Sequence, residues 1–285
     1  MPLSSLLNQL RTPRKRMMKN NTVVRIVVSV LTIPLILLLI FLGGYWFLTF
    51  GLVIGILSFF EFAGMTEKKS AHPMKIAGLL SVLALIANSF FRFSGFLELL
   101  LIIVVVTLLI ELFRNMGSAI NNLGATYLGI FYIGLCSASL IGIREFFPVY
   151  ENGGFLIISI FATIWICDSA AFFGGISLGK HKLFPRVSPN KSWEGAIFGF
   201  VFSIATMVAA RYLILGFLSW QDVLIIGFIV GTIGQLGDLV ESLFKRDAGV
   251  KDSSSLIPGH GGIFDRFDSL MLTAPVVYLY LKHFV

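Results

Sequence analysis

Long apolar runs dominate this sequence and limit what it can fold into. Hydrophobic residues make up 56% of the 285 residues, and charged residues only 13%, about half of their share in a soluble domain. A helix needs about 20 mainly apolar residues to cross a bilayer. The stretches that meet or approach this length are 23–42, 45–63, 76–91, 96–113, 124–147, 154–176, 193–218, 221–244 and 267–284. The sequence therefore predicts an all-α, polytopic transmembrane helical bundle with about nine spans.

The distribution of basic residues predicts the orientation of these spans. The first run follows a basic tail, is too long for the core of a signal peptide and lacks a small-residue cleavage site, so we expect a retained span. With a cytoplasmic N-terminus, 18 of the 22 Lys and Arg residues fall on the inner side, as the positive-inside rule requires. The net charge of +7 could indicate a nucleic-acid partner, but with so little soluble surface a charge bias toward the inner leaflet explains it better. We expect a multi-pass protein of the cell (inner or plasma) membrane with no nucleic-acid partner.

Acidic residues distinguish the two halves of the chain. Before residue 150 they lie at predicted span ends or in loops, whereas Asp168, Asp238 and Glu241 lie inside later spans. A charge near the bilayer centre costs about 2.5–3.5 kcal/mol, so these carboxylates must face a protein interior or a wet cavity. We expect a basic cytoplasmic tail (1–22), an N-terminal transmembrane scaffold (23–150) and a C-terminal transmembrane catalytic region (151–285).

The predicted inner loop before the last span concentrates charge. From Lys245 to Asp268, 8 of 24 residues are charged. Asp238 on one helix and Asp265 and Asp268 on the next would form an oxygen-rich site for a hard divalent cation. Mg²⁺ takes one or two carboxylates and completes its shell with water and substrate phosphates. We therefore predict a Mg²⁺ site, with Asp168 as a further candidate ligand and a second cation left open.

The same loop carries groups suited to phosphate binding. Its basic candidates are Lys245, Arg246, Lys251 and Arg266. The Pro-Gly-His-Gly-Gly turn at 258–262 exposes backbone N–H groups that can hold anions, and His260 is either a phosphate or pyrophosphate partner or a plain turn residue. A second inner segment, 179–194, adds Ser188 and Lys191, unless it serves only as an orientation signal. These parts are typical of a phosphoryl or nucleotidyl transfer site that faces the cytoplasm.

The stretch 242–268 resembles the signature of the integral-membrane phosphatidate cytidylyltransferases, also called CDP-diacylglycerol synthases. Its fixed positions are all present: Ser242, Phe244, Lys245, Arg246, Lys251, Asp252, Pro258, His260, Gly261, Gly262, Asp265, Arg266 and Asp268. The Asp168-Ser169 pair and the run at 188–195 also look like family features, and the resemblance covers about 165–275. It implies the reaction of CTP with phosphatidate to give CDP-diacylglycerol and pyrophosphate, with Mg²⁺, in phospholipid biosynthesis.

Residue type and the resemblance together indicate roles for individual residues of the site. Asp238, Asp265 and Asp268 are expected to act in catalysis as metal ligands, together with Lys245, Arg246 and His260. The expected substrate-binding residues are Lys251, Asp252, Arg266, Ser188, Lys191, Gly261 and Gly262. The attacking phosphate monoester is already largely dianionic at pH 7, so catalysis reduces to positioning and charge neutralisation.

The sequence leaves two other functions open, a lipid kinase and a transporter, and it also leaves open whether the protein forms a homodimer. A CTP-dependent lipid kinase would use similar groups but needs a base for its alcohol substrate and releases CDP. A secondary transporter also holds intramembrane acids, but no inverted repeat is visible. Small-xxx-small pairs such as Gly51/Gly55 are typical of helix packing and leave a homodimer open.

Overall fold

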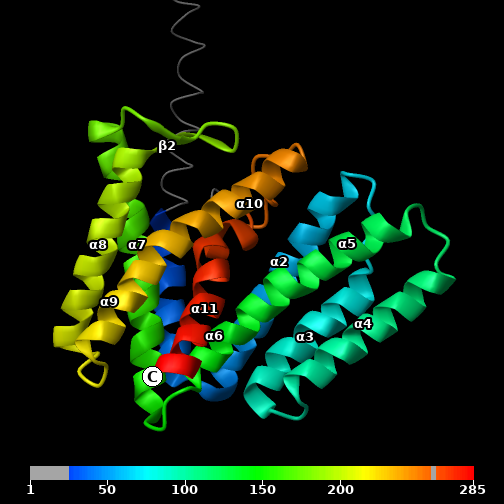
Figure 1. Cartoon of the computed structure of the whole chain (residues 1–285), viewed down its shortest axis with the longest axis horizontal. Coiled ribbons are helices and arrows are strands. Elements are labelled where there is room, and N and C mark those ends of the chain that lie inside the picture. The colour runs from blue at the N-terminus through cyan, green and yellow to red at the C-terminus, as the bar shows by residue number, and fades with distance from the viewer. Residues whose placement is uncertain (1–25, 258–260) are drawn as a thin grey trace, which may run out of the picture.

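The computed structural model describes residues 26–257 and 261–285, and helices form nearly all of this part of the chain (Figure 1). The helical elements are Ile26–Leu42, α2 (Gly44–Glu67), α3 (Lys75–Phe91), α4 (Phe96–Phe113), α5 (Ala119–Gly129), η1 (Ile130–Leu135), α6 (Cys136–Arg144), α7 (Tyr150–Leu178), α8 (Trp193–Leu213), α9 (Trp220–Ile229), η2 (Val230–Gly234), α10 (Gln235–Asp247) and α11 (Phe264–Phe284). The π-helical turns η1 and η2 join α5 to α6 and α9 to α10 as continuous helices. Each predicted apolar run therefore coincides with a helical segment.

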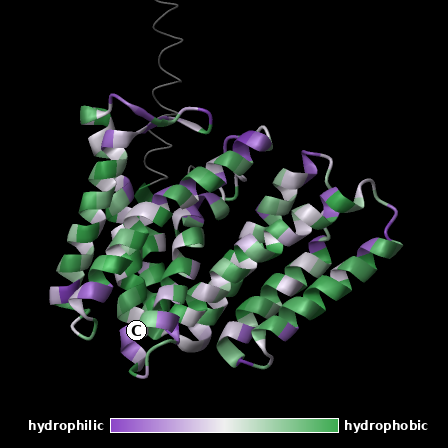
Figure 2. Ribbon diagram, viewed as in Figure 1, coloured by the Kyte–Doolittle hydropathy of each residue, from purple (hydrophilic) through white to green (hydrophobic). Residues whose placement is uncertain are grey.

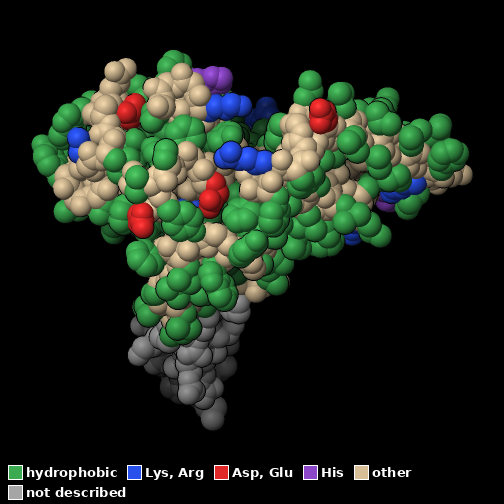
Figure 3. All heavy atoms as spheres, turned by 90° about the horizontal axis from the view of Figure 1, so that it is seen from below, with side chains coloured by type: hydrophobic (Ala, Val, Ile, Leu, Met, Phe, Trp, Pro, Cys, Tyr) green, Lys and Arg blue, Asp and Glu red, His purple; other side chains and the backbone are tan. Residues whose placement is uncertain are grey.

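Six of the described helices are long and apolar enough to cross a membrane. They are Gly44–Glu67, Phe96–Phe113, Ala119–Arg144, Tyr150–Leu178, Trp193–Leu213 and Trp220–Asp247, and Ile26–Leu42 and α3 are shorter apolar helices. Hydrophilic residues gather at the helix ends and in the loops (Figure 2), and hydrophobic side chains cover much of the face in Figure 3. The all-α membrane bundle is confirmed. The nine spans and the cytoplasmic N-terminus stay predictions, and the tail 1–22 lies outside the described residues.

The last helix connects the two halves of the chain. α11 packs against α6 and α2, which precede residue 150, and against α10 and η2, which follow it. In Figure 1 it runs between α7–α9 on one side and α2–α6 on the other. Buried hydrophobic residues from both halves, such as Ile141, Ile164 and Val277, belong to one core. The C-terminal helix is therefore held by the N-terminal helices through extensive apolar packing.

A short hairpin links α7 to α8 at one end of the bundle. Strands β1 (Lys182–Phe184) and β2 (Ser188–Ser192) pair antiparallel. The hydroxyl of Ser192 accepts a hydrogen bond of 3.2 Å from the Gly195 N–H and so caps the start of α8, where four N–H groups lack helical partners. The second inner segment is thus an ordered hairpin that leads directly into a helix.

Candidate active site

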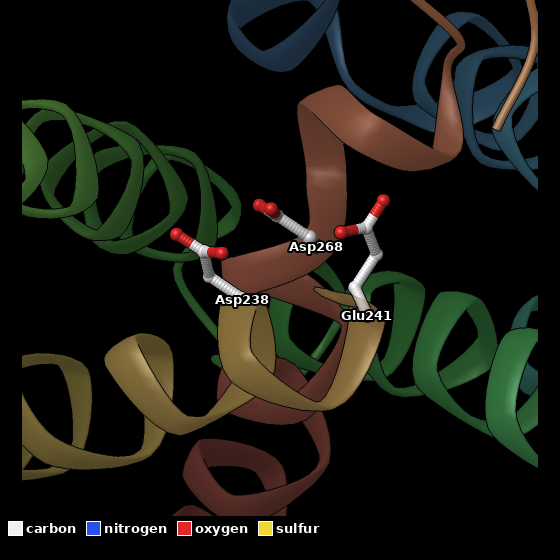
Figure 4. A group of neighbouring side chains, drawn as sticks. All are labelled: Asp238, Glu241 and Asp268. Atoms are coloured by element: carbon white, nitrogen blue, oxygen red, sulfur yellow. The ribbon is translucent and has the colours of Figure 1, made fainter. Parts of the chain in front are cut away.

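Three carboxylates converge where α10 lies against the first turns of α11 (Figure 4). Asp238 and Glu241 come from one face of α10, and Asp268 comes from α11. One oxygen from each lies within 4.8 Å of the others. Glu241 is completely buried, and the other two are partly exposed. Carboxylates this close repel one another unless cationic groups or protons compensate them.

Small residues allow α10 to come this close to α11. Gly237 precedes Asp238, and a Cβ atom at Gly237 would lie only 2.7 Å from the Asp268 carbonyl oxygen. A Cβ atom at Gly234 would lie 3.2 Å from the Thr273 hydroxyl. The π-helical turn η2 directly before α10 adds a residue to the helical turn, a feature that is frequent at functional sites. The glycines therefore determine how closely the carboxylates approach.

Two lysines compensate part of the negative charge. The ammonium of Lys191, at the end of β2, lies 2.6 Å from an Asp238 oxygen. Lys245 lies 2.7 Å from Glu241 and 2.8 Å from Asp265. Arg246 fastens the hairpin to α10, because its Nε donates a hydrogen bond of 3.3 Å to the Val187 carbonyl. The segments 179–194 and 245–268 identified in the sequence thus each contribute a lysine to this group of carboxylates.

Asp265 lies beside the three-carboxylate group and is held by the signature loop. One of its oxygens accepts hydrogen bonds from the Ser253 N–H at 3.0 Å and the Gly262 N–H at 2.8 Å. The Ser253 hydroxyl lies 3.0 Å from the same oxygen and shares its single proton between Asp265 and Glu61. The other oxygen of Asp265 contacts Lys245. Gly261 adopts φ +83° in the turn before Asp265, a conformation that glycine tolerates. The role of Asp265 as a metal ligand stays a prediction. In this structure Lys245 occupies one of its carboxylate oxygens and would have to move away before a metal ion could bind there.

The remaining predicted residues differ in burial and in their contact with this centre. Asp168 on α7 is near enough to Asp238 and Lys191 for their charges to interact. Lys251, Asp252 and Arg266 are exposed, and Ser188 is partly buried on β2. His260, with Pro258, lies outside the described residues.

Two glutamates that the sequence analysis did not assign belong to this site. Glu241 shares a helix face with Asp238 through its i, i+3 spacing, and that spacing could have identified it. Glu61 on α2 is buried and accepts hydrogen bonds from Ser254, in the loop between α10 and α11, and from Phe264 at the start of α11. It lies near the end of a predicted span, where an acidic residue is ordinary, so nothing in the sequence distinguishes it.

The fold and the site define an integral-membrane protein with a three-carboxylate centre that two lysines flank. The cytidylyltransferase family matches this chain over residues 23–284, and the chain belongs to that family. It is 31% identical over 275 residues to the phosphatidate cytidylyltransferase of Staphylococcus haemolyticus, which covers 93% of this chain and 99% of the relative. The enzyme of the same name from Bacillus subtilis is 35% identical over 267 residues (91% and 97%), and that from Brucella suis is 32% identical over 266 residues (92% and 93%). The resemblance seen in the signature is thereby confirmed and extends through the N-terminal half.

Proposed function

We infer that this protein transfers a cytidylyl group from CTP to phosphatidate and so forms CDP-diacylglycerol and pyrophosphate. The observation that carries this function is the match to phosphatidate cytidylyltransferases over more than nine-tenths of the chain. Two residues of the signature, Lys245 and Asp268, belong to the carboxylate and lysine centre. The lipid kinase and the transporter are disfavoured by the same match.

The reaction needs the charges that this site carries. The phosphate monoester of phosphatidate attacks the α-phosphorus of CTP, one P–O bond forms, and the bond to the leaving pyrophosphate breaks. Two anions must therefore approach one another, so catalysis depends on positioning and on neutralising charge. Lys191 and Lys245 are held at the centre by carboxylates, and exposed Arg266 lies next to Asp265 in the chain. We propose that these three cations bind substrate phosphates.

The carboxylates fit a hard divalent cation. Three oxygens that lie within 4.8 Å of one another on two helices are the donor type that Mg²⁺ prefers, and Mg²⁺ usually completes its shell with water and phosphate oxygens. Asp238, Glu241 and Asp268 would hold the ion, which would neutralise phosphate charge. Asp168 is the further candidate, and a second cation remains part of the proposal.

We propose that the site opens to the cytoplasm, where CTP is found. The hairpin and the C-terminal end of α10 lie at the same end of the bundle (Figure 1), and the charge bias predicts that this end is inside. Native Cys136 and Cys167 are buried, so a Ser255→Cys variant gives one exposed thiol in the loop. A membrane-impermeant maleimide should label it in inside-out vesicles. Labelling only in right-side-out vesicles would reverse the proposed orientation.

The activity is tested with purified protein in detergent. CDP-diacylglycerol and pyrophosphate should appear in equal amounts from CTP and phosphatidate, and both should disappear without phosphatidate. A chelator should also stop both, and added Mg²⁺ should restore them. Folded protein that forms neither product would refute the proposed activity, whereas activity in excess chelator would refute the metal requirement alone.

A further inference from the structure

Glu61 makes a set of contacts that the reaction described above leaves unexplained. Its carboxylate, in the buried part of α2, accepts four hydrogen bonds from residues about 200 positions later in the chain. The Ser253 hydroxyl and the Phe264 N–H each donate to one oxygen at 2.8 Å. The Ser254 hydroxyl and the Ile263 N–H donate to the other, at 2.7 and 3.0 Å. Glu61 thus joins the middle of the loop between α10 and α11 (248–263), here called the signature loop, to the start of α11.

These four donors place the carboxylate at the start of α11. The Ile263 and Phe264 N–H groups belong to the first turn, which has no helical acceptors and carries a partial positive charge. A carboxylate suits this position because it accepts several hydrogen bonds and compensates the helix dipole. The space around it is filled, since a Cβ atom at Gly262 would collide with the Glu61 carboxylate and the Ser253 hydroxyl. A larger residue at this position would displace the hydrogen-bonded side chains of Glu61 and Ser253.

A continuous set of contacts leads from Glu61 to the active centre. The Ser253 hydroxyl that contacts Glu61 also contacts Asp265. Asp265 contacts Lys245, and Lys245 contacts Glu241. Asp268 lies one turn after Asp265 on the same helix. Glu61 itself is absent from the three-carboxylate group, so it acts through the loop and α11.

We propose that Glu61 is a positioning residue, through which the N-terminal helices hold the signature loop and the first turn of α11 in the geometry for cytidylyl transfer. The proposal rests on the proposed function. Glutamine at this position has one carbonyl oxygen, and its NH₂ group would face N–H and O–H donors. Glu61→Gln therefore loses at least one hydrogen bond to a charged acceptor and sets donors against one another.

The test compares Glu61→Gln with Glu67→Gln, which removes the same charge from the same helix. Glu67 is exposed, pairs with Lys75 and makes none of the loop contacts of Glu61. In Glu61→Gln, kcat should fall about ten- to a hundredfold, while KM for CTP changes less than about threefold because Glu61 does not touch substrate. Hydrogen exchange should accelerate at Ile263 and Phe264 only. The Glu67→Gln protein should match the wild type in each measurement.

Three results would overturn the proposal. The first is a kcat of Glu61→Gln within about twofold of wild type, and the second is unchanged exchange at Ile263 and Phe264. The third is faster exchange throughout the protein with normal kcat for the folded fraction, which would make Glu61 merely structural.

Ser254→Ala decides the question if Glu61→Gln does not fold, because it removes one donor and leaves the carboxylate in place. It should lower kcat about two- to tenfold, and wild-type kcat and exchange would overturn the proposal. A wild-type protein that fails to use CTP and phosphatidate would refute the proposed function, and the exchange data would still decide whether Glu61 holds the loop.

Discussion

Replacement of Gly237 by alanine should slow the reaction strongly while leaving the protein folded. The added methyl group would lie 2.7 Å from the Asp268 carbonyl oxygen and 3.2 Å from the Ser269 Cα. Ordinary contact begins near 3.4 Å, so α10 and α11 must separate by about 0.7 Å at the point where their carboxylates meet. The obstacle is backbone, which cannot rotate away as a side chain can.

The size of both effects follows from that displacement. Overpacking of this kind costs about 1–3 kcal/mol of stability. A displacement approaching 1 Å in a site that relies on positioning costs on the order of 100-fold in rate. We therefore expect kcat for CDP-diacylglycerol formation to fall about 10- to 100-fold and the Mg²⁺ concentration for half-maximal activity to rise.

The matched control is Gly124→Ala in α5. A Cβ atom there meets nothing within 4 Å, so the same substitution should leave rate and unfolding temperature close to wild type. Rates and thermal unfolding of both variants in the same detergent test the reasoning. If Gly237→Ala were as active as Gly124→Ala, the close approach of α10 to α11 would not determine the geometry of the site.

Three further substitutions test other contacts. Lys191→Ala should lower activity at least about tenfold. It should change stability by no more than about 1 kcal/mol, because the ion pair of Lys191 with Asp238 is partly exposed. Lys182→Ala in the same hairpin is the control in the activity assay. In a Mg²⁺ titration, Asp268→Asn should raise the Mg²⁺ concentration needed for half-maximal activity. Asp247 is exposed on α10, so the control Asp247→Asn should leave that concentration unchanged. Arg144→Ala should lower stability by about 2–4 kcal/mol in thermal unfolding, because the buried guanidinium donates to two backbone carbonyls; an unchanged unfolding temperature would contradict that role.

The positions of the helices could be predicted from the sequence because each span must be apolar over a fixed length. The break between the first two helices could also be predicted from Gly43 and Gly44. In the structure both glycines adopt positive φ at this boundary. The π-helical turns and the β1–β2 hairpin could not be predicted. An apolar run has the same composition whether one turn contains four residues or five, and the hairpin reads as a polar loop.

The site could be predicted only in part, because its geometry depends on how α10 crosses α11. The sequence groups Asp238, in the eighth predicted span, with Asp265 and Asp268 of the signature as an oxygen-rich site. Whether Glu241 or Asp265 completes the carboxylate cluster depends on the Gly237 contact and on Lys245, which lies between them. The i, i+3 spacing places Glu241 on the same helix face as Asp238. Which carboxylates of α11 this face meets is decided by tertiary contacts between the helices.

Paired reactions with CTP labelled at the α- or the γ-phosphate test the central claim most directly. The purified protein, Mg²⁺ and phosphatidate are present in both, and the lipid phase is counted. Cytidylyl transfer places the α label in the lipid and releases the γ label as pyrophosphate. The γ label in the lipid would indicate a kinase, and no label in the lipid from either reaction would contradict the proposed function.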